Sequence, residues 1–139
     1  MSLTGIHINN ILNIQDKNNK HIKFFQIFVE PLTDYSSKGK YSQAIKYINN
    51  NNIKLVVHSS YSINLSRRWR SYDWWIEYVI NEIKICHELQ AIALVFHTGK
   101  RLELSTPEAI NNMYTSLVYI HKQRGNVSRL SVMDTSSQF

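Results

Sequence analysis

Residues 54–58, KLVVH, decide the fold: this short run is rich in β-branched residues and ends in a histidine. The same arrangement recurs at residues 91–97, AIALVFH, and at residues 130–134, LSVMD. A stretch with helical periodicity separates each run from the next. Short, almost wholly apolar runs alternating with helices are typical of strands buried in a parallel sheet.

Each of the three runs ends in a residue that can bind a metal ion. The carboxyl ends of parallel strands lie at one edge of a sheet, where such folds carry their chemistry. We therefore expect His58, His97 and Asp134 to converge there and to form a metal site. For each histidine the alternative is a hydrogen-bonded residue at the rim of the core, and for Asp134 it is a turn or helix cap.

The rest of the chain continues the alternation of strands and helices. We expect strands at 6–9, 24–29, 53–57, 91–96 and 129–133, and helices at 42–50, from Trp74 to about Cys86 and from Thr106 to about Gln123. Ser105-Thr106-Pro107-Glu108 is a helix-start signal, and Gly125 is expected to end that helix. This order predicts an α/β fold of parallel β/α units with right-handed crossovers, either an open sheet or the first five strands of an eight-stranded barrel.

Length and composition limit the class of protein. The 139 residues form one domain, 1–139, with a formal net charge of +6 that favours acidic partners, nucleic acid first among them. The alternative is a basic protein that binds nothing acidic. Cys86 is the single cysteine and is expected to be buried within a helix. We find neither a signal peptide nor an apolar stretch of membrane-spanning length, so we expect an intracellular protein, cytoplasmic or nuclear, without a membrane partner.

Several segments resemble the endonuclease IV family of DNA-repair enzymes. Residues 58–65, HSSYSINL, resemble the His-x-Ser-Tyr-x-Ile-Asn-Leu segment that follows the third strand of that family. Residues 93–99, ALVFHTG, resemble its Asn-Phe-His-Pro-Gly-type segment. Residues 5–8, 25–28 and 133–138 resemble its first, second and fifth strand segments more weakly. The similarity covers nearly the whole chain but only the N-terminal half of a family enzyme.

The resemblance implies a xylose-isomerase-like TIM (β/α)8 barrel, of which this chain would form about the first five strands. It also implies a cluster of up to three Zn²⁺ ions that cleaves double-stranded DNA on the 5′ side of an abasic site in base-excision repair. His58 and His97 take the places of zinc ligands, and Asp134 takes that of a bridging glutamate. We assign no catalytic residue beyond these ligands. Because the family's later ligands lie on strands that this chain lacks, we expect fewer zinc ions here, or none.

The resemblance also points to residues that contact DNA. Tyr61 matches a tyrosine that enters the DNA at the abasic nucleotide, and Asn64 matches a position where we expect a loop-shaping role. Neighbouring cations could bind phosphates: Arg67, Arg68, Arg70, Lys100 and Arg101. The alternative for this region is a solvated loop followed by an aromatic helix in which Trp74 and Trp75 face the core.

The sequence departs from the family pattern in three places. Asp134 is one methylene shorter than glutamate, residues 30–33 lack an arginine that family members often place there, and the glycine before Gln138 is missing. The sequence therefore leaves a non-catalytic DNA-binding remnant and a metal-dependent sugar isomerase or epimerase open as alternatives. The chain could be a fragment, a truncated copy, or a half barrel that self-associates through its open sheet edges.

Overall fold

The computed structural model describes residues 5–29, 41–123 and 131–134, the last four as backbone only. The expectations for residues 30–33, Gly125 and Gln138 lie outside these described residues.

All five described strands form one parallel sheet in the order β1-β2-β3-β4-β5. The strands are β1 (Gly5–Ile8), β2 (Phe24–Ile27), β3 (Lys54–His58), β4 (Ala93–Phe96) and β5 (Ser131–Asp134). The helices are η1 (Ile11–Gln15), η2 (Lys17–Asn19), α2 (Ser42–Asn50), α3 (Trp74–Glu88) and α4 (Thr106–Gln123), where η marks a 3-10 helix. The predicted elements are therefore confirmed, with ends that move by a few residues.

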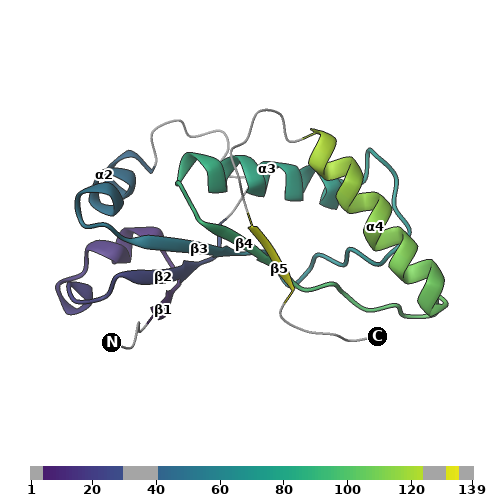
Figure 1. Ribbon diagram of the computed structural model, residues 1–139, viewed down its shortest axis with the longest axis horizontal. Helices are drawn as coiled ribbons and strands as arrows, with labels where there is room; N and C mark the ends of the chain where they lie inside the picture. Colours follow the sequence, from purple (N-terminus) through teal and green to yellow (C-terminus); the bar gives the residue numbers. More distant parts are fainter. Residues whose placement is uncertain (1–4, 30–40, 124–130, 135–139) are drawn as a thin grey trace.

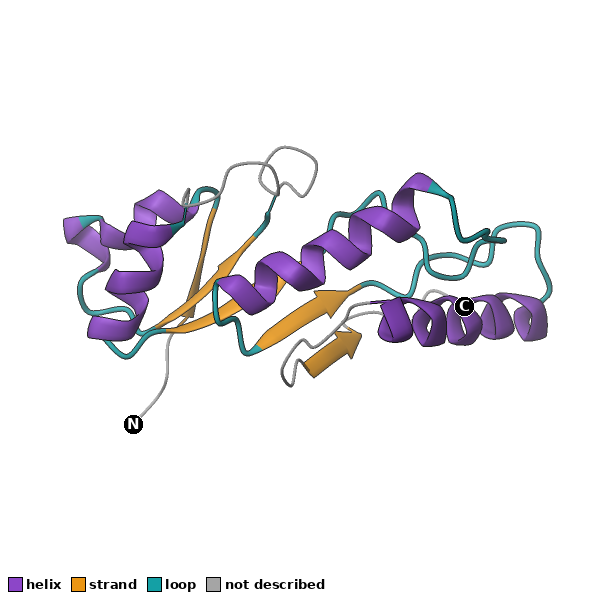
Figure 2. Cartoon of the chain, turned by 90° about the horizontal axis from the view of Figure 1, so that it is seen from above, coloured by secondary structure: helices purple, strands orange, loops and turns teal. Residues whose placement is uncertain are grey.

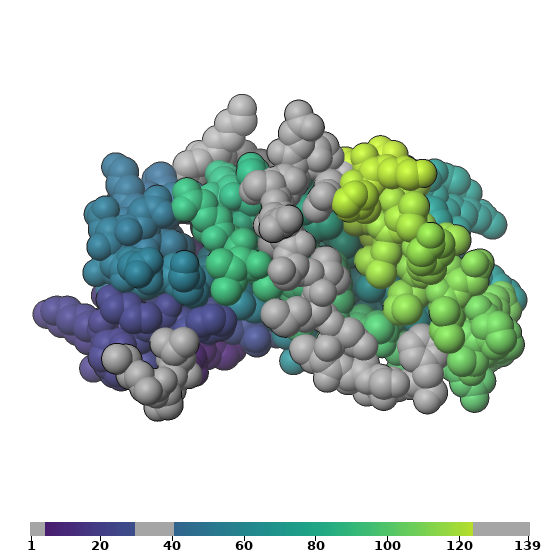
Figure 3. All heavy atoms as spheres, in the orientation of Figure 1, coloured from purple at the N-terminus to yellow at the C-terminus, as the bar shows by residue number. Residues whose placement is uncertain are grey.

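The strand order decides between the two architectures that the sequence left open. Each strand pairs with the one that precedes it along the chain, and α2, α3 and α4 lie on one side of the sheet (Figure 1). In the space-filling view of the same orientation, α2 and α4 lie toward opposite ends of the molecule (Figure 3). A doubly wound sheet would reverse its strand order and carry helices on both faces. The fold is therefore the barrel type, with consecutive β/α units wound in one direction.

Alternate residues of the central strands enter different clusters. Leu55, Val57 and Leu94 belong to the main core with Trp75 and other side chains of α3. Val56, Ala93 and Val95 form a separate small cluster, against which Phe24 packs. Since successive side chains of a strand point to opposite faces, the second cluster marks the face away from the helices.

The sequence of helix α3 has the spacing of buried residues that is typical of a helix packed on one face. Trp75, Val79, Glu82 and Cys86 recur at three- and four-residue intervals and are buried. Cys86 is fully buried as predicted, and burial raises the pKa of its thiol well above the usual value, with a further contribution from the charge of Glu82. Trp74, by contrast, is half-exposed, so only one of the two tryptophans is a core residue.

The predicted cap of α4 is present, since the Glu108 amide donates to the Ser105 hydroxyl at 3.3 Å.

In the described part of the chain, no helix combines the length and the apolar character needed to cross a bilayer.

The two clusters predict which side chain lowers the free energy of unfolding most when it is replaced by alanine. Leu94 is fully buried beneath α3, so Leu94→Ala should lower the free energy of unfolding by about 2–5 kcal/mol. Leu12, on η1, is 54% exposed, so Leu12→Ala should change it by less than about 0.5 kcal/mol. Urea titrations of both variants measure the difference. Equal effects would contradict the placement of Leu94 in the main core.

Candidate metal and nucleic-acid site

The structure brings His58 and His97 together. His58 ends β3 and pairs in register with Val95 of β4, and His97 follows two residues later on the same face of the sheet. The two imidazole centroids lie 5.0 Å apart at an interplanar angle of 50°. Two imidazoles on one tetrahedral zinc, with Zn–N bonds of about 2.1 Å, have centroids roughly 5 Å apart. This spacing therefore suits a shared ion or two adjacent ions.

His58 is held in the tautomer that a metal ligand needs. Its Nδ1 lies 2.6 Å from the carbonyl oxygen of Ser59, so Nδ1 carries the proton and Nε2 carries the lone pair. Burial lowers the pKa of His58 from its ordinary value of 6.5, and this outweighs the opposing effect of that hydrogen bond. The imidazoles of His97 and His7 lower the pKa further. At neutral pH His58 is therefore uncharged, as metal binding requires.

Ser59 connects this histidine to the core. Its hydroxyl donates to Oε2 of Glu82 at 2.8 Å, and its amide donates to the carbonyl of Val95 at 2.8 Å. Glu82 is fully buried on α3. Neither Ser59 nor Glu82 was predicted as a site residue, although an acid within the apolar stripe of a helix was a usable signal. Glu82 thus fixes the residue whose carbonyl orients His58.

Aromatic rings surround the two imidazoles. Tyr61 stacks on His97 with centroids 5.2 Å apart and lies 5.1 Å from His58, while 72% of its surface remains exposed. Phe28, which directly follows β2, lies 5.1 Å from His58 and 5.0 Å from His7. Phe28 was not predicted as a site residue, because its sequence position indicates only the end of a strand.

Hydrogen bonds join the loop that follows β3 to the loop that follows β4. Asn64 Nδ2 donates to the carbonyl of Lys100 at 2.9 Å, and its Oδ1 accepts from the Ser66 amide at 3.0 Å. The Ser66 hydroxyl donates to the carbonyl of Thr98 at 2.8 Å. Asn64 therefore bonds as a loop-shaping residue does. Both loops extend from the same end of the sheet (Figure 2).

Gly99 is required between these loops for two reasons. Its φ of +91° lies in the left-handed region that side chains rarely adopt. A Cβ built there would lie 1.9 Å from Oδ1 of Asn64.

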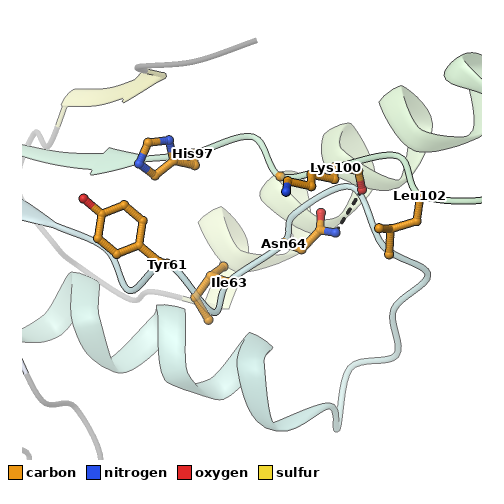
Figure 4. A pocket seen from close by; sticks show the side chains of 7 residues that line it. Tyr61, Ile63, Asn64, His97, Lys100 and Leu102 are labelled. Carbon is orange, nitrogen blue, oxygen red and sulfur yellow. Dashed lines mark hydrogen bonds between the residues drawn. The ribbon is translucent and has the colours of Figure 1, made fainter. Parts of the chain in front are cut away.

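Two hollows adjoin along the joined loops. One of about 490 Å³ is lined by Tyr61, Ile63, Asn64, His97, Gly99 and Leu102 among others, and Figure 4 shows Tyr61 and His97 at one end and Leu102 at the other. The second, of about 340 Å³, is lined by Arg67, Arg68, Lys100 and Arg101. Asn64, Lys100 and Leu102 line both, so the two hollows form one groove.

Four of the five cations predicted to contact DNA line this groove, and Arg70 does not. Arg70 Nη1 donates to the hydroxyl of Tyr72 at 2.9 Å, and its guanidinium lies 5.9 Å from the centre of that ring. Arg68 forms an ion pair with Glu108 at 2.9 Å.

The third predicted ligand is placed only by its backbone. Asp134 lies in register opposite Phe96, the residue before His97, and its side chain lies outside the described structure. Within the described residues, no group of three or more histidine, cysteine or acidic side chains could hold a metal ion. The described donors are therefore the two imidazoles.

Gly99→Ala tests the joined loops. The added methyl meets the Asn64 side chain in a strained backbone, so we expect a loss of about 2–4 kcal/mol in the free energy of unfolding. Asn64→Ala should cost about 1–2 kcal/mol through its lost hydrogen bonds. The double variant should lose less than the sum of the two, because the clash disappears. Gly5→Ala is the control for adding a methyl group to a glycine. Its Cβ would meet the Phe24 ring at 3.0 Å and its φ is not in the left-handed region, so its effect should add to that of Asn64→Ala. Additive losses would contradict the contact.

The lowered pKa of His58 predicts how stability varies with pH. Between the folded pKa and 6.5, the unfolded chain binds a proton at this residue and the folded chain does not. The stability that uncharged His58 gives the folded state is complete above pH 6.5, and it is lost as the pH falls toward the folded pKa of His58. Urea denaturation across this range should show a smaller pH dependence for His58→Gln than for the wild type. The Hε1 resonance of His58 should titrate below the ordinary pKa of 6.5. A His58 midpoint at or above 6.5 would contradict the burial effect.

Comparison with known proteins gave no match to a family model. The chain is 30% identical over 101 residues to "Probable endonuclease 4" of Mesoplasma florum, covering 71% of this chain and 34% of that protein. It is 29% identical over 75 residues to the protein of the same name from Mycoplasma mycoides subsp. mycoides SC, covering 52% of this chain and 26% of that protein. The chain thus spans about a third or less of the length of these curated relatives.

Solved structures show the same fold. Endonuclease IV from Thermus thermophilus matches with a TM-score of 0.68 and 17% identity, over 96% of this chain and 53% of that one. A D-tagatose 3-epimerase-like protein matches with a TM-score of 0.62 and 18% identity, over 93% of this chain and 52% of that one. A xylose isomerase domain protein from Planctomyces limnophilus matches with a TM-score of 0.63 and 8% identity, over 93% of this chain and 51% of that one. These proteins confirm the predicted xylose-isomerase-like barrel architecture, and the sequence relatives confirm that the chain is similar to part of the endonuclease IV family.

Proposed function

We propose that this chain is part of an apurinic/apyrimidinic endonuclease, which hydrolyses the phosphodiester on the 5′ side of an abasic site with the help of zinc. The observation that carries the proposal is the pair of imidazoles, His58 and His97, 5.0 Å apart at the carboxyl ends of adjacent strands. The similarity to proteins named endonuclease 4 supports it.

The residues present fit a zinc ion in part. Nε2 of His58 carries the lone pair, and His97 lies within reach of the same ion. A bound zinc would neutralise charge on a phosphodiester and supply a water nucleophile. Zinc sites with an open catalytic position have three protein ligands. Asp134 remains our proposal for the third, although its backbone pairs with Phe96 and so stands one position out of the row that carries the two imidazoles.

The other residues of the site bind and orient the substrate. The exposed ring of Tyr61 can stack where a base is missing, since an aromatic side chain offers an apolar face to the gap. Arg67, Lys100 and Arg101 face the groove and can bind phosphates of double-stranded DNA. Asn64 keeps the two loops at the spacing this requires.

A second candidate is non-catalytic binding of DNA. One observation favours it: within the described residues no group of three or more side chains could hold a metal ion, and a catalytic zinc site uses three protein ligands. A sugar isomerase or epimerase has no comparable support, because similarity to such proteins is in fold alone.

Zinc binding and DNA cleavage test the proposal together. We expect the purified chain to bind at least about one zinc ion, and His58→Gln or His97→Gln to weaken binding at least about tenfold, because each removes a ligand. His121→Gln, on the exposed side of α4, is the control. Duplex DNA with a tetrahydrofuran abasic analogue should be nicked on its 5′ side, and chelation should stop this.

Three results would contradict the endonuclease proposal. Less than one zinc per chain without nicking would remove its basis. Salt-sensitive DNA binding without nicking at full zinc loading would favour the non-catalytic candidate. Turnover of a ketose with a divalent ion, and none of DNA, would favour the sugar enzymes.

A further inference from the structure

Glu82 is an acid at a position where an apolar residue would serve the fold better. It is fully buried on α3, within the row of core residues Trp75, Val79 and Cys86. Burying a carboxyl group costs free energy even when the group is hydrogen-bonded, whereas a leucine would continue the apolar face of the helix. Residues that break the pattern of a core at a cost to stability often serve a function.

Glu82 and the two imidazoles lie on opposite faces of the sheet. Val57 of β3 belongs to the core beneath α3, and Ser59 faces the same way, since its hydroxyl donates to Oε2 of Glu82 at 2.8 Å. His58 lies between them and faces the other side, where its ring meets that of His97. Helix α3 lies on the first of these two faces (Figure 1). Ser59 therefore links a helix on one face of the sheet to an imidazole on the other.

The peptide group between Ser59 and Ser60 is held from both sides. The Ser59 amide donates to the Val95 carbonyl at 2.8 Å, and its hydroxyl is held by α3. On the other side, Ser60 begins a turn in which its carbonyl accepts from the Ile63 amide at 3.1 Å. The Ser59 carbonyl, which belongs to this peptide group, accepts from Nδ1 of His58 at 2.6 Å. Fixing this peptide group therefore fixes which imidazole nitrogen carries the proton.

We propose that Glu82 is a positioning residue: its hydrogen bond to Ser59 keeps His58 in the tautomer that presents Nε2 to a metal ion. The choice of zinc rests on the proposed function, whereas the tautomer is a property of the chain without metal. When the hydrogen bond is absent, the 59–60 peptide group can turn and the imidazole can move its proton to Nε2, the commoner tautomer of a free histidine side chain. That proton would have to leave Nε2 before a metal ion binds there.

A double variant separates this role from a purely structural one. Ser59→Ala/Glu82→Leu replaces both partners of the buried hydrogen bond by apolar side chains, so it should unfold at the wild-type temperature or above it. ¹⁵N NMR of the metal-free chain, at about pH 8 where histidines are neutral, reports the tautomer from the shifts of the two ring nitrogens. The loss of signals in His58→Gln assigns them. The proton should lie on Nδ1 in the wild type and mostly on Nε2 in the double variant.

The affinity for Zn²⁺ is the second measurement. Calorimetric titration with Zn²⁺ should show binding about tenfold weaker in the double variant, as is usual when the partner of a metal-binding histidine is lost. Glu82→Gln keeps an oxygen that accepts from the Ser59 hydroxyl, so it should retain the wild-type tautomer and most of the affinity. Glu77→Leu removes one negative charge from the exposed side of the same helix and should leave both unchanged.

Two results would overturn this role of Glu82. One is a double variant that keeps the proton of His58 on Nδ1, above all if its unfolding temperature falls, because Glu82 would then serve the fold alone. The other is a Glu82→Gln variant that behaves as the double variant does, because the hydrogen bond would then not be the cause.

The zinc site and the positioning role fail separately. A chain whose tautomer responds as expected but which binds no zinc contradicts the zinc site and leaves the control of the tautomer by Glu82. A chain that binds zinc equally well in the wild type and in the double variant contradicts the positioning role and leaves the zinc site.

Discussion

The site depends on the parallel pairing of β3 with β4. Val57 pairs with Leu94 and His58 with Val95, and the Ser59 amide continues the ladder to the Val95 carbonyl at 2.8 Å. Parallel pairing places both carboxyl ends at one edge, and strand alternation places both imidazoles on the face away from the helices. A shift of one residue in this register would move one imidazole to the opposite face. The backbone ladder therefore fixes the spacing of the two rings before any side-chain contact is made.

Buried and partly buried hydrogen bonds hold the loop beyond β3 in a defined shape. Ser66 bonds to the β4 loop through Thr98, and α4 contributes Asn112 Nδ2 to the Ser66 carbonyl and the Ser116 hydroxyl to the Leu65 carbonyl. These bonds pair backbone groups that a loop would otherwise leave to water. A loop fixed from two elements keeps its groove in shape before a ligand arrives, which lowers the entropy lost on binding.

Local pattern was enough to predict much of this architecture. The runs ending at His58 and His97 identified two adjacent strands and the residues at their ends, and Ser105 identified the start of α4 through its cap. The contacts that depend on the path of a loop could not be predicted. Arg68 meets Glu108 across 40 residues of chain, and Arg70 turns to Tyr72 rather than to the groove. Glu82 and Phe28 were missed because neither departs from the pattern of its own helix or strand. Their contacts with Ser59 and His58 depend on how separate elements pack together.

The distribution of charge along the groove favours a division of tasks. The rings of Phe28 and Tyr61 pack against His58, and the arginines line only the second hollow, while Lys100 lines both. A guanidinium beside the imidazoles would repel a metal dication and would weaken the pair as a ligand site. Farther along the groove, the same charge attracts phosphates without competing for that position. Under the proposed function, cations in one hollow would hold a strand while its reacting phosphate meets the His97 side of the imidazole pair in the other, and each end can be altered without removing the other.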